Sequence, residues 1–102
     1  MYYAIISEDI ENSLEKVLQL RGVVFEWIDT ENKSIGVIAQ EVQKVLPDVV
    51  HEDPDSGLLS VAYGNMVGVL IEAIKEQQDE ITELKTQMAE ITSRLDKLDG
   101  SN

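Results

Sequence analysis

The sequence predicts an α+β protein in which a small head of two short helices and a few short strands precedes one long C-terminal helix. In the last third of the chain, apolar residues recur at alternating steps of three and four through five heptads, as in a coiled coil. Before this repeat, short apolar runs are separated by Gly, Pro, Asp and Asn, which is typical of short strands, helices and turns. We therefore expect a head over residues 1–64, a coiled-coil helix over residues 65–98 and a disordered tail over residues 99–102.

The composition limits the classes of partner for this chain. It has 20 acidic and 8 basic residues, a formal charge of −12, and no cysteine. A surface of this sign repels nucleic acids and anionic membranes, and a chain without thiols forms neither disulfides nor thiolate metal sites. No apolar run approaches the roughly 20 residues that cross a bilayer. We expect neither nucleic acid nor a membrane among its partners.

The first predicted helix covers residues 8–20. It follows an apolar run at residues 2–6, which suggests a short strand or the end of a preceding domain. Ser7 is placed to cap this helix, and acidic residues follow in the first turn, where the helix dipole favours them. Gly22 lies just past the helix end, where a left-handed residue is expected. The apolar face of the helix would consist of Ile10, Leu14, Val17 and Leu18.

A strand is predicted over residues 23–28, a polar turn over residues 29–33 and a second helix over residues 37–46. Pro47 ends this helix because proline has no backbone N–H to continue the hydrogen-bond pattern. One face of the strand is expected to lie in the core and consists of Val23, Phe25 and Trp27. The apolar face of the helix consists of Ile38, Val42, Val45 and Leu46.

Residues 48–63 predict a β-hairpin. Its strands are residues 48–52 and 58–63, and the Pro-Asp-Ser-Gly sequence at residues 54–57 is a strong turn signal between them. Asn65 follows the second strand and is expected to cap the long helix, since asparagine is among the preferred N-cap residues.

The long helix carries a seam of ten residues, nine of them apolar. The a positions are Val67, Ile74, Ile81, Met88 and Leu95, and the d positions are Leu70, Gln77, Leu84, Ile91 and Leu98. β-Branched residues at a with leucine at d favour dimers, whereas isoleucine at d favours higher order, so the heptads leave dimer and trimer open. The alternative is a single helix packed inside a larger partner fold.

Three further features of the long helix bear on its partners. Gln77, buried among equivalent glutamines, would set the register at some cost in stability. Glu80 at a g position and Lys85 at the next e position can pair between parallel helices. Additional apolar residues near the start of the helix are expected where the first turns pack against the head as well as against sister helices; these are Met66, Val69, Ile71 and Ala73.

The sequence predicts no cofactor and no metal site. His51 is followed by an acidic turn, but the spacing of the carboxylates matches no calcium loop, so a solvated turn is expected. No glycine-rich phosphate loop is present. None of four serines belongs to a His/Asp arrangement suited to hydrolysis of an external substrate; these are Ser7, Ser13, Ser34 and Ser60.

Three blocks of residues resemble a known family. Residues 17–27 contain Val-Leu-Gln-Leu-Arg-Gly-Val and then Phe-x-Trp, and residues 35–47 contain Ile-Gly-Val-Ile-Ala-Gln-Glu-Val and then Leu-Pro. The third block joins Leu-Ser-Val-Ala-Tyr at residues 59–63 to Leu-Ile-Glu-Ala-Ile-Lys-Glu at residues 70–76. In order and spacing, the blocks resemble the C-terminal intramolecular chaperone domain of bacteriophage tailspikes and tail fibres, of the endosialidase type. A related domain occurs in the myelin regulatory factor.

This resemblance implies a homotrimer at the end of a tail-fibre or tailspike polypeptide, and the choice of trimer over dimer comes from it alone. The domain would bring three chains together and help the preceding β-rich stalk to fold, after which self-cleavage at its N-terminal edge would release it. The location implied is the host cell cytoplasm during phage assembly, or the tail fibre or spike of the virion if the domain is not cleaved.

The resemblance does not extend to the cleavage residues. The family has a serine followed by aspartate, with a lysine base five residues after the serine. The nearest match here is Ser7-Glu8, with Asn12 at the fifth position and the first lysine, Lys16, only at the ninth. We therefore predict that the chain does not cleave itself, either because the site lies upstream or because this is an uncleaved variant. The alternatives are an autoprotease that uses Ser7 and a structural tip or adaptor that stays on the virion.

Overall fold

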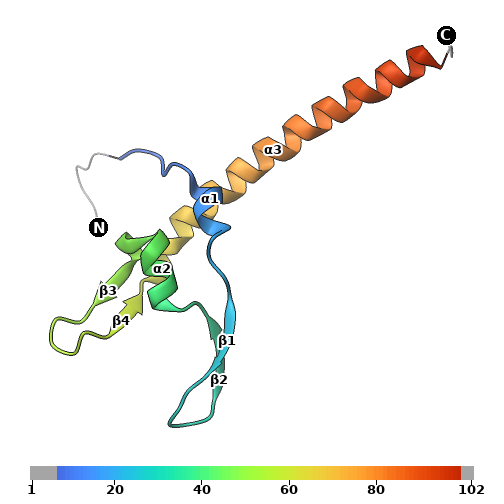
Figure 1. The fold of residues 1–102 in the computed structure, drawn as a ribbon. Coiled ribbons are helices and arrows are strands. Elements are labelled where there is room, and N and C mark those ends of the chain that lie inside the picture. The colour runs from blue at the N-terminus through green and yellow to red at the C-terminus, as the bar shows by residue number, and fades with distance from the viewer. Residues whose placement is uncertain (1–6, 100–102) are drawn as a thin grey trace.

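A computed structural model describes residues 7–99 and shows a small head at one end of a long helix (Figure 1). We call residues 7–62 the head. The extents along the principal axes are 74 × 43 × 23 Å, so the molecule is elongated. Its elements are α1 (Ser13–Val17), β1 (Val23–Glu26), β2 (Lys33–Gly36), α2 (Ala39–Val45), the 3-10 helix η1 (Pro47–Val49), β3 (Val50–Glu52), β4 (Leu59–Val61) and α3 (Tyr63–Leu98).

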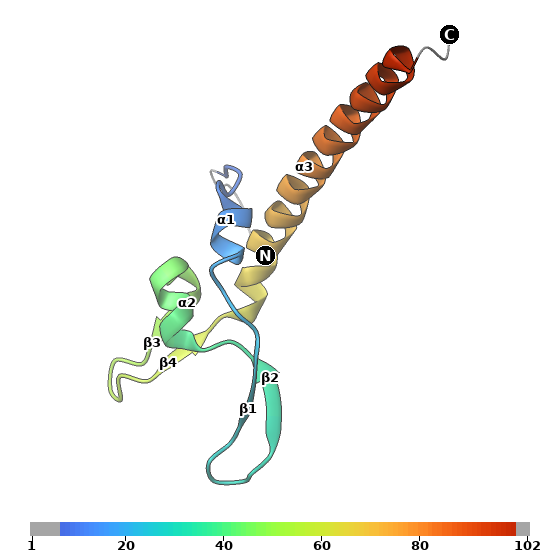
Figure 2. The same ribbon diagram turned by 45° about the vertical axis from the view of Figure 1, so that its right-hand side comes forward.

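The strands form two separate antiparallel hairpins. β1 pairs with β2 from Val23 opposite Gly36 to Glu26 opposite Lys33. β3 pairs with β4 from Val50 opposite Val61 to Glu52 opposite Leu59. Both hairpins extend away from the C-terminal end of α3, and α1 lies alongside the first half of that helix (Figure 2).

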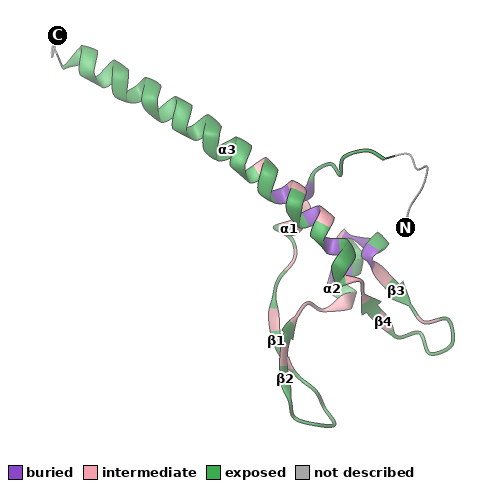
Figure 3. Cartoon of the chain, turned by 180° about the vertical axis from the view of Figure 1, so that it is seen from behind, coloured by how far each residue is buried: buried purple, intermediate pink, exposed green. Residues whose placement is uncertain are grey.

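The core of the head forms between α2, η1 and the first turns of α3. Its buried residues are Val42, Leu46, Val49, Met66 and Val69, all less than 8% exposed. Buried residues are confined to this end of the molecule (Figure 3). The prediction of an α+β head followed by a long helix is therefore confirmed, as are the second helix and the β3–β4 hairpin, both slightly shorter than expected.

The predicted helix over residues 8–20 is wrong in its extent, because α1 begins only at Ser13 and ends at Val17. Asn12 adopts a left-handed conformation, with φ 57°, that interrupts any helix entering from its N-terminal side. Ser7 lies six residues before the helix and does not cap it. Gly22 does not have the positive φ expected of a left-handed cap. The strand suggested for residues 2–6 lies outside the described residues.

The first hairpin differs most from the expectation. Lys33–Gly36 was expected to be turn and helix entry but forms β2, and β1 ends at Glu26 instead of residue 28. The Phe25 and Trp27 rings share one side and meet edge to face at 5.2 Å, but Trp27 is 54% exposed and therefore lies outside the core. The turn is closed by backbone hydrogen bonds between Trp27 and Asn32 (2.8 Å) and between Glu31 and Trp27 (2.8 Å).

The second hairpin runs directly into α3. Pro47 ends α2 as predicted and also begins η1, so β3 starts at Val50. α3 begins at Tyr63, two residues before the predicted cap. Asn65 therefore lies within the first turn, where its N–H donates to the Ala62 carbonyl at 3.0 Å, and no side chain caps this end. Within residues 7–99, no helix is long and apolar enough to cross a membrane.

Candidate oligomerisation interface

The seam of α3 lies uncovered along the whole helix. Its nine apolar residues are between 40% exposed, at Ile81, and 83% exposed, at Leu98. Gln77 is exposed as well, and every residue from Gln77 to Asp99 is exposed (Figure 3). A continuous apolar stripe of this length is typical of an interaction surface, because soluble monomers rarely leave such stripes in water.

A second stripe of α3 faces the head. Met66, Val69 and Ala73 are only 7%, 5% and 4% exposed and recur at steps of three and four, at the g and c positions beside the seam. The prediction that these three residues pack against the head is confirmed. Ile71 is 52% exposed, so it is not part of the buried stripe. It lies at an e position, on the opposite flank of the seam.

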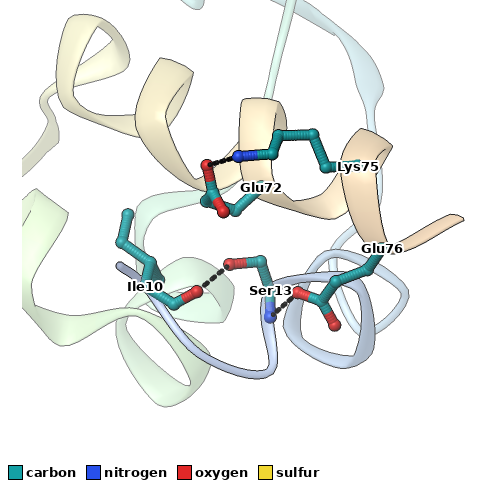
Figure 4. A network of polar contacts seen from close by, with 5 residues as sticks. All are labelled: Ile10, Ser13, Glu72, Lys75 and Glu76. Atoms are coloured by element: carbon teal, nitrogen blue, oxygen red, sulfur yellow. Dashed lines mark hydrogen bonds and ion pairs between the residues drawn. The ribbon is translucent and has the colours of Figure 1, made fainter. Parts of the chain in front are cut away.

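Glu76 is the next residue of the head-facing stripe, and its carboxylate ends the contact with the head. Its Oε2 accepts a hydrogen bond from the backbone N–H of Ser13 at 2.8 Å (Figure 4). It also accepts one from the N–H of Leu14, the next residue of α1, at 3.4 Å. Ser13 is fully buried, and its hydroxyl donates to the Ile10 carbonyl at 3.5 Å. The role of Glu76 was not predicted from the sequence, although the change from apolar to acidic side chains along the g and c positions marks this residue.

A groove of about 330 Å³ lies where the seam meets the head. Its lining includes Val17, Leu20, Val37, Tyr63, Met66 and Leu70. Leu70 belongs to the seam, and Met66 belongs to the head-facing stripe. The apolar surface of the seam therefore continues from α3 onto α1 and the segments next to it, where a second chain lying along the seam would also contact the head.

An ion pair joins the segment after α1 to α2. The Arg21 guanidinium donates two hydrogen bonds to the Glu41 carboxylate, at 2.9 and 2.8 Å. These hydrogen bonds lower the pKa of Glu41 and raise the pKa of Arg21. Both side chains are solvent-exposed, and we expect the pair to orient α2 more than to stabilise the head.

Gly36 allows the end of β2 to approach the first turn of α3. The Tyr63 hydroxyl accepts a hydrogen bond from the N–H of Val37 at 3.3 Å. A Cβ at residue 36 would lie 2.6 Å from that hydroxyl oxygen and 3.2 Å from Phe25 Cε1, so no larger residue fits without displacing the ring of Tyr63. This contact links the first hairpin to α3.

Ser7 and His51, the other residues considered as site candidates in the sequence, lie in separate parts of the head. Ser7 is exposed in the irregular segment before α1, and His51 is exposed on β3 opposite Ser60. No group of three or more His, Asp or Glu side chains in residues 7–99 is arranged to hold a metal. Asp53 instead organises the β3–β4 turn, where its carboxylate accepts hydrogen bonds from the Ser56 hydroxyl (2.6 Å) and N–H (3.0 Å), which lower its pKa.

Comparison with known proteins identifies the head. Residues 5–51 match the family described as Chaperone of endosialidase. The head therefore carries a Chaperone of endosialidase domain. The resemblance noted in the sequence is thus confirmed, and the family match ends within β3, before the helix that carries the seam.

Similar proteins extend the similarity beyond the head. The chain is 36% identical over 90 residues to the long tail fiber protein Gp37 of Enterobacteria phage K3. The alignment covers 78% of this chain and 7% of that protein. The Gp37 protein of Enterobacteria phage T2 is also 36% identical over 90 residues, covering 78% of this chain and 6% of the relative. The Gp37 protein of Enterobacteria phage M1 is 32% identical over 90 residues, and the alignment covers 79% of this chain and 36% of that protein. The chain thus spans only a minor part of the length of these relatives.

Proposed function

We propose that this Chaperone of endosialidase domain is an intramolecular chaperone of a phage tail fibre. Three copies associate through the seam and assist the folding and assembly of the fibre segment to which they are attached. The observation that supports the proposal is the uncovered seam. α3 buries the apolar g and c residues of its first half under its own head, whereas its a and d residues are exposed along the whole helix. The names of the relatives supply the class of client, a long tail fibre.

The energetics of the seam favour association. Each fully buried aliphatic side chain contributes about 1.5–3 kcal/mol. The five-heptad seam contributes nine such residues from each chain. Burial of these residues is the favourable contribution that opposes the roughly 4–15 kcal/mol that association costs in lost translational and rotational freedom. The groove beside Leu70 adds apolar surface of the head to the same interface.

Trimerisation before fibre folding has a physical advantage. A β-rich stalk in which chains intertwine depends on contacts that are distant in sequence or between chains, so it folds slowly and exposes strand edges meanwhile. Joining three chains through their α3 helices turns the encounter of the stalk strands into an intramolecular step with a high effective concentration. This work would take place in the host cytoplasm during phage assembly.

Sedimentation equilibrium of the purified chain at micromolar concentration tests the proposed stoichiometry. We expect a species of three times the chain mass of 11.4 kDa. A monomer would refute association through the seam, whereas a dimer would retain the seam and refute the trimer. The chaperone role is tested by expressing a fibre segment with and without this domain, where only the fused segment should yield trimers that resist denaturation by detergent.

We further propose that the domain does not cleave itself at Ser7. Supporting this, the fifth residue after Ser7 is Asn12, which adopts a left-handed conformation, and Lys16 lies inside α1. Intact-mass measurement of a fusion with an upstream fibre segment should show one uncut chain, identical in the Ser7→Ala variant. A cut before Ser7 that Ser7→Ala abolishes would instead establish the autoprotease alternative. An uncut domain found on mature virions would favour the structural tip over a released chaperone.

A further inference from the structure

α1 lacks the features that make a helix stable alone. It has five residues, far fewer than the roughly 12–15 that an isolated helix needs in water. The residue at its N-cap, Asn12, makes no side-chain hydrogen bond to the first turn. The N–H groups at the start of α1 therefore need an acceptor from elsewhere in the chain.

α3 supplies that acceptor. The Glu76 carboxylate accepts hydrogen bonds from the first two N–H groups of α1, at 2.8 and 3.4 Å. Figure 4 shows the shorter of these bonds, from Ser13. A negative charge in this place is favoured by the dipole of the capped helix. Ser13 is fully buried, so removal of the carboxylate would leave its N–H without water as a substitute partner.

A second contact lies two turns earlier on the same side of α3. A Cβ at Gly68 would lie 3.5 Å from Ile10 Cδ1, an ordinary packing distance, so the segment before α1 passes directly over this residue. Residues 10–14 therefore follow α3 from Gly68 to Glu76, and only the second of these contacts involves a charge.

We propose that Glu76 is the N-terminal cap of α1, supplied by another helix, and that it makes folding of residues 10–18 conditional on a folded α3. The cap also determines where the chain entering the head lies relative to α3. All of its atoms belong to one chain, so the proposal holds whether or not copies associate.

Amide hydrogen exchange, followed by NMR on the full chain, tests this proposal with Glu76→Ala. We expect the amides of α1 to exchange about tenfold faster. Loss of a capping interaction, or of a hydrogen bond to a charged group, raises the equilibrium constant for local opening by about this factor. The amides of α2 should keep their wild-type rates. The matched control is Glu83→Ala, which removes the same side chain from an exposed c position one heptad later and should leave α1 unchanged.

Glu76→Gln provides a variant with less risk of misfolding. Its amide oxygen can still accept the hydrogen bond but carries no charge, so α1 should exchange at a rate between those of the wild type and Glu76→Ala. Unchanged exchange of α1 in Glu76→Ala would overturn the proposal. So would an equal increase in α1 and α2, in either variant, because Glu76 would then stabilise the head as a whole.

Discussion

The two halves of α3 carry the same seam but differ on their other side. From Tyr63 to Glu76, the g and c positions are apolar and lie under the head, ending in the carboxylate that caps α1. From Gln77 to Leu98, the same positions hold polar and charged residues, and all of them are exposed. The seam residues themselves are exposed in both halves.

This difference separates two tasks within one helix. In the first half, the head covers the g and c residues, so this part of the helix is held in place by contacts within its own chain. The second half makes no contact with the head, so only association with other chains can bury its apolar residues. Because helices in water gain most of their stability from packing of an apolar face, the second half would depend most on the proposed assembly.

The largest effect is expected from Ile81→Asp, which targets the second half alone. In the proposed trimer it would bury three carboxylates close together, at a cost of several kcal/mol for each charge. Sedimentation equilibrium at micromolar concentration should then show dissociated chains with a folded head. Ser93→Asp, at an f position far from the seam, is the control and should stay associated; a fully trimeric Ile81→Asp would refute the assigned register.

The same substitution at two methionines compares the halves directly. Met66 is 7% exposed beneath the head, whereas Met88 is 65% exposed in the seam. Met66→Ala should lower the free energy of unfolding of the head by about 2–5 kcal/mol at any protein concentration. Met88→Ala should weaken association only, so its effect should disappear on dilution to monomers.

Chemical denaturation followed by the fluorescence of Trp27, the one tryptophan in the chain, measures the head in both methionine variants. Repeating the titration at high and low protein concentration separates folding from association. Equal concentration dependence of the two variants would contradict the division of α3 into two halves.

A smaller effect is expected where the first hairpin meets the first half of α3. Gly36→Ala introduces a methyl group 2.6 Å from the Tyr63 hydroxyl oxygen, which should displace the ring and cost about 1–3 kcal/mol in thermal or chemical unfolding. Gly22→Ala is the control, since a Cβ there meets nothing within 4 Å. Adding Tyr63→Phe removes the clashing oxygen and should restore part of the loss; a double variant without any recovery would show that the clash lies elsewhere.

The smallest effect is expected from Glu41→Gln, on the surface of the head. Hydrogen bonds from Arg21 lower the pKa of Glu41, so its contribution to stability is present above the unfolded pKa and is lost as the pH falls through the lower folded value. The melting temperatures of the wild type and Glu41→Gln should therefore differ slightly at pH 7 and converge as the pH falls through the lowered pKa of Glu41. High salt at pH 7 should also reduce the difference, because the pair is exposed.

The elements that were predicted correctly depend on local patterns. α2, the turn at residues 54–57 and the long helix each carry their own periodicity, glycine or proline signal. The division into residues 1–64, 65–98 and 99–102 and the ten seam residues as a trimer interface remain predictions, since they concern other chains or the tail.

The elements that were mispredicted depend on residues distant in sequence. β2 is a strand because β1 offers hydrogen-bonding partners for residues 33–36, which carry no strong strand pattern of their own. α1 begins at Ser13 instead of residue 8 because Asn12 turns the chain and Glu76, far away in sequence, caps the helix that follows.

The sequence alone determined that this chain has a long helix with an apolar a and d stripe, and that its head carries the residues of the Chaperone of endosialidase family. Periodicity and local motifs are enough for such conclusions, because they act over a few residues. Only the tertiary structure decided which part of that helix the head covers. That depends on the contacts of Met66, Val69, Ala73 and Glu76 with segments more than ten residues away, which no local pattern specifies.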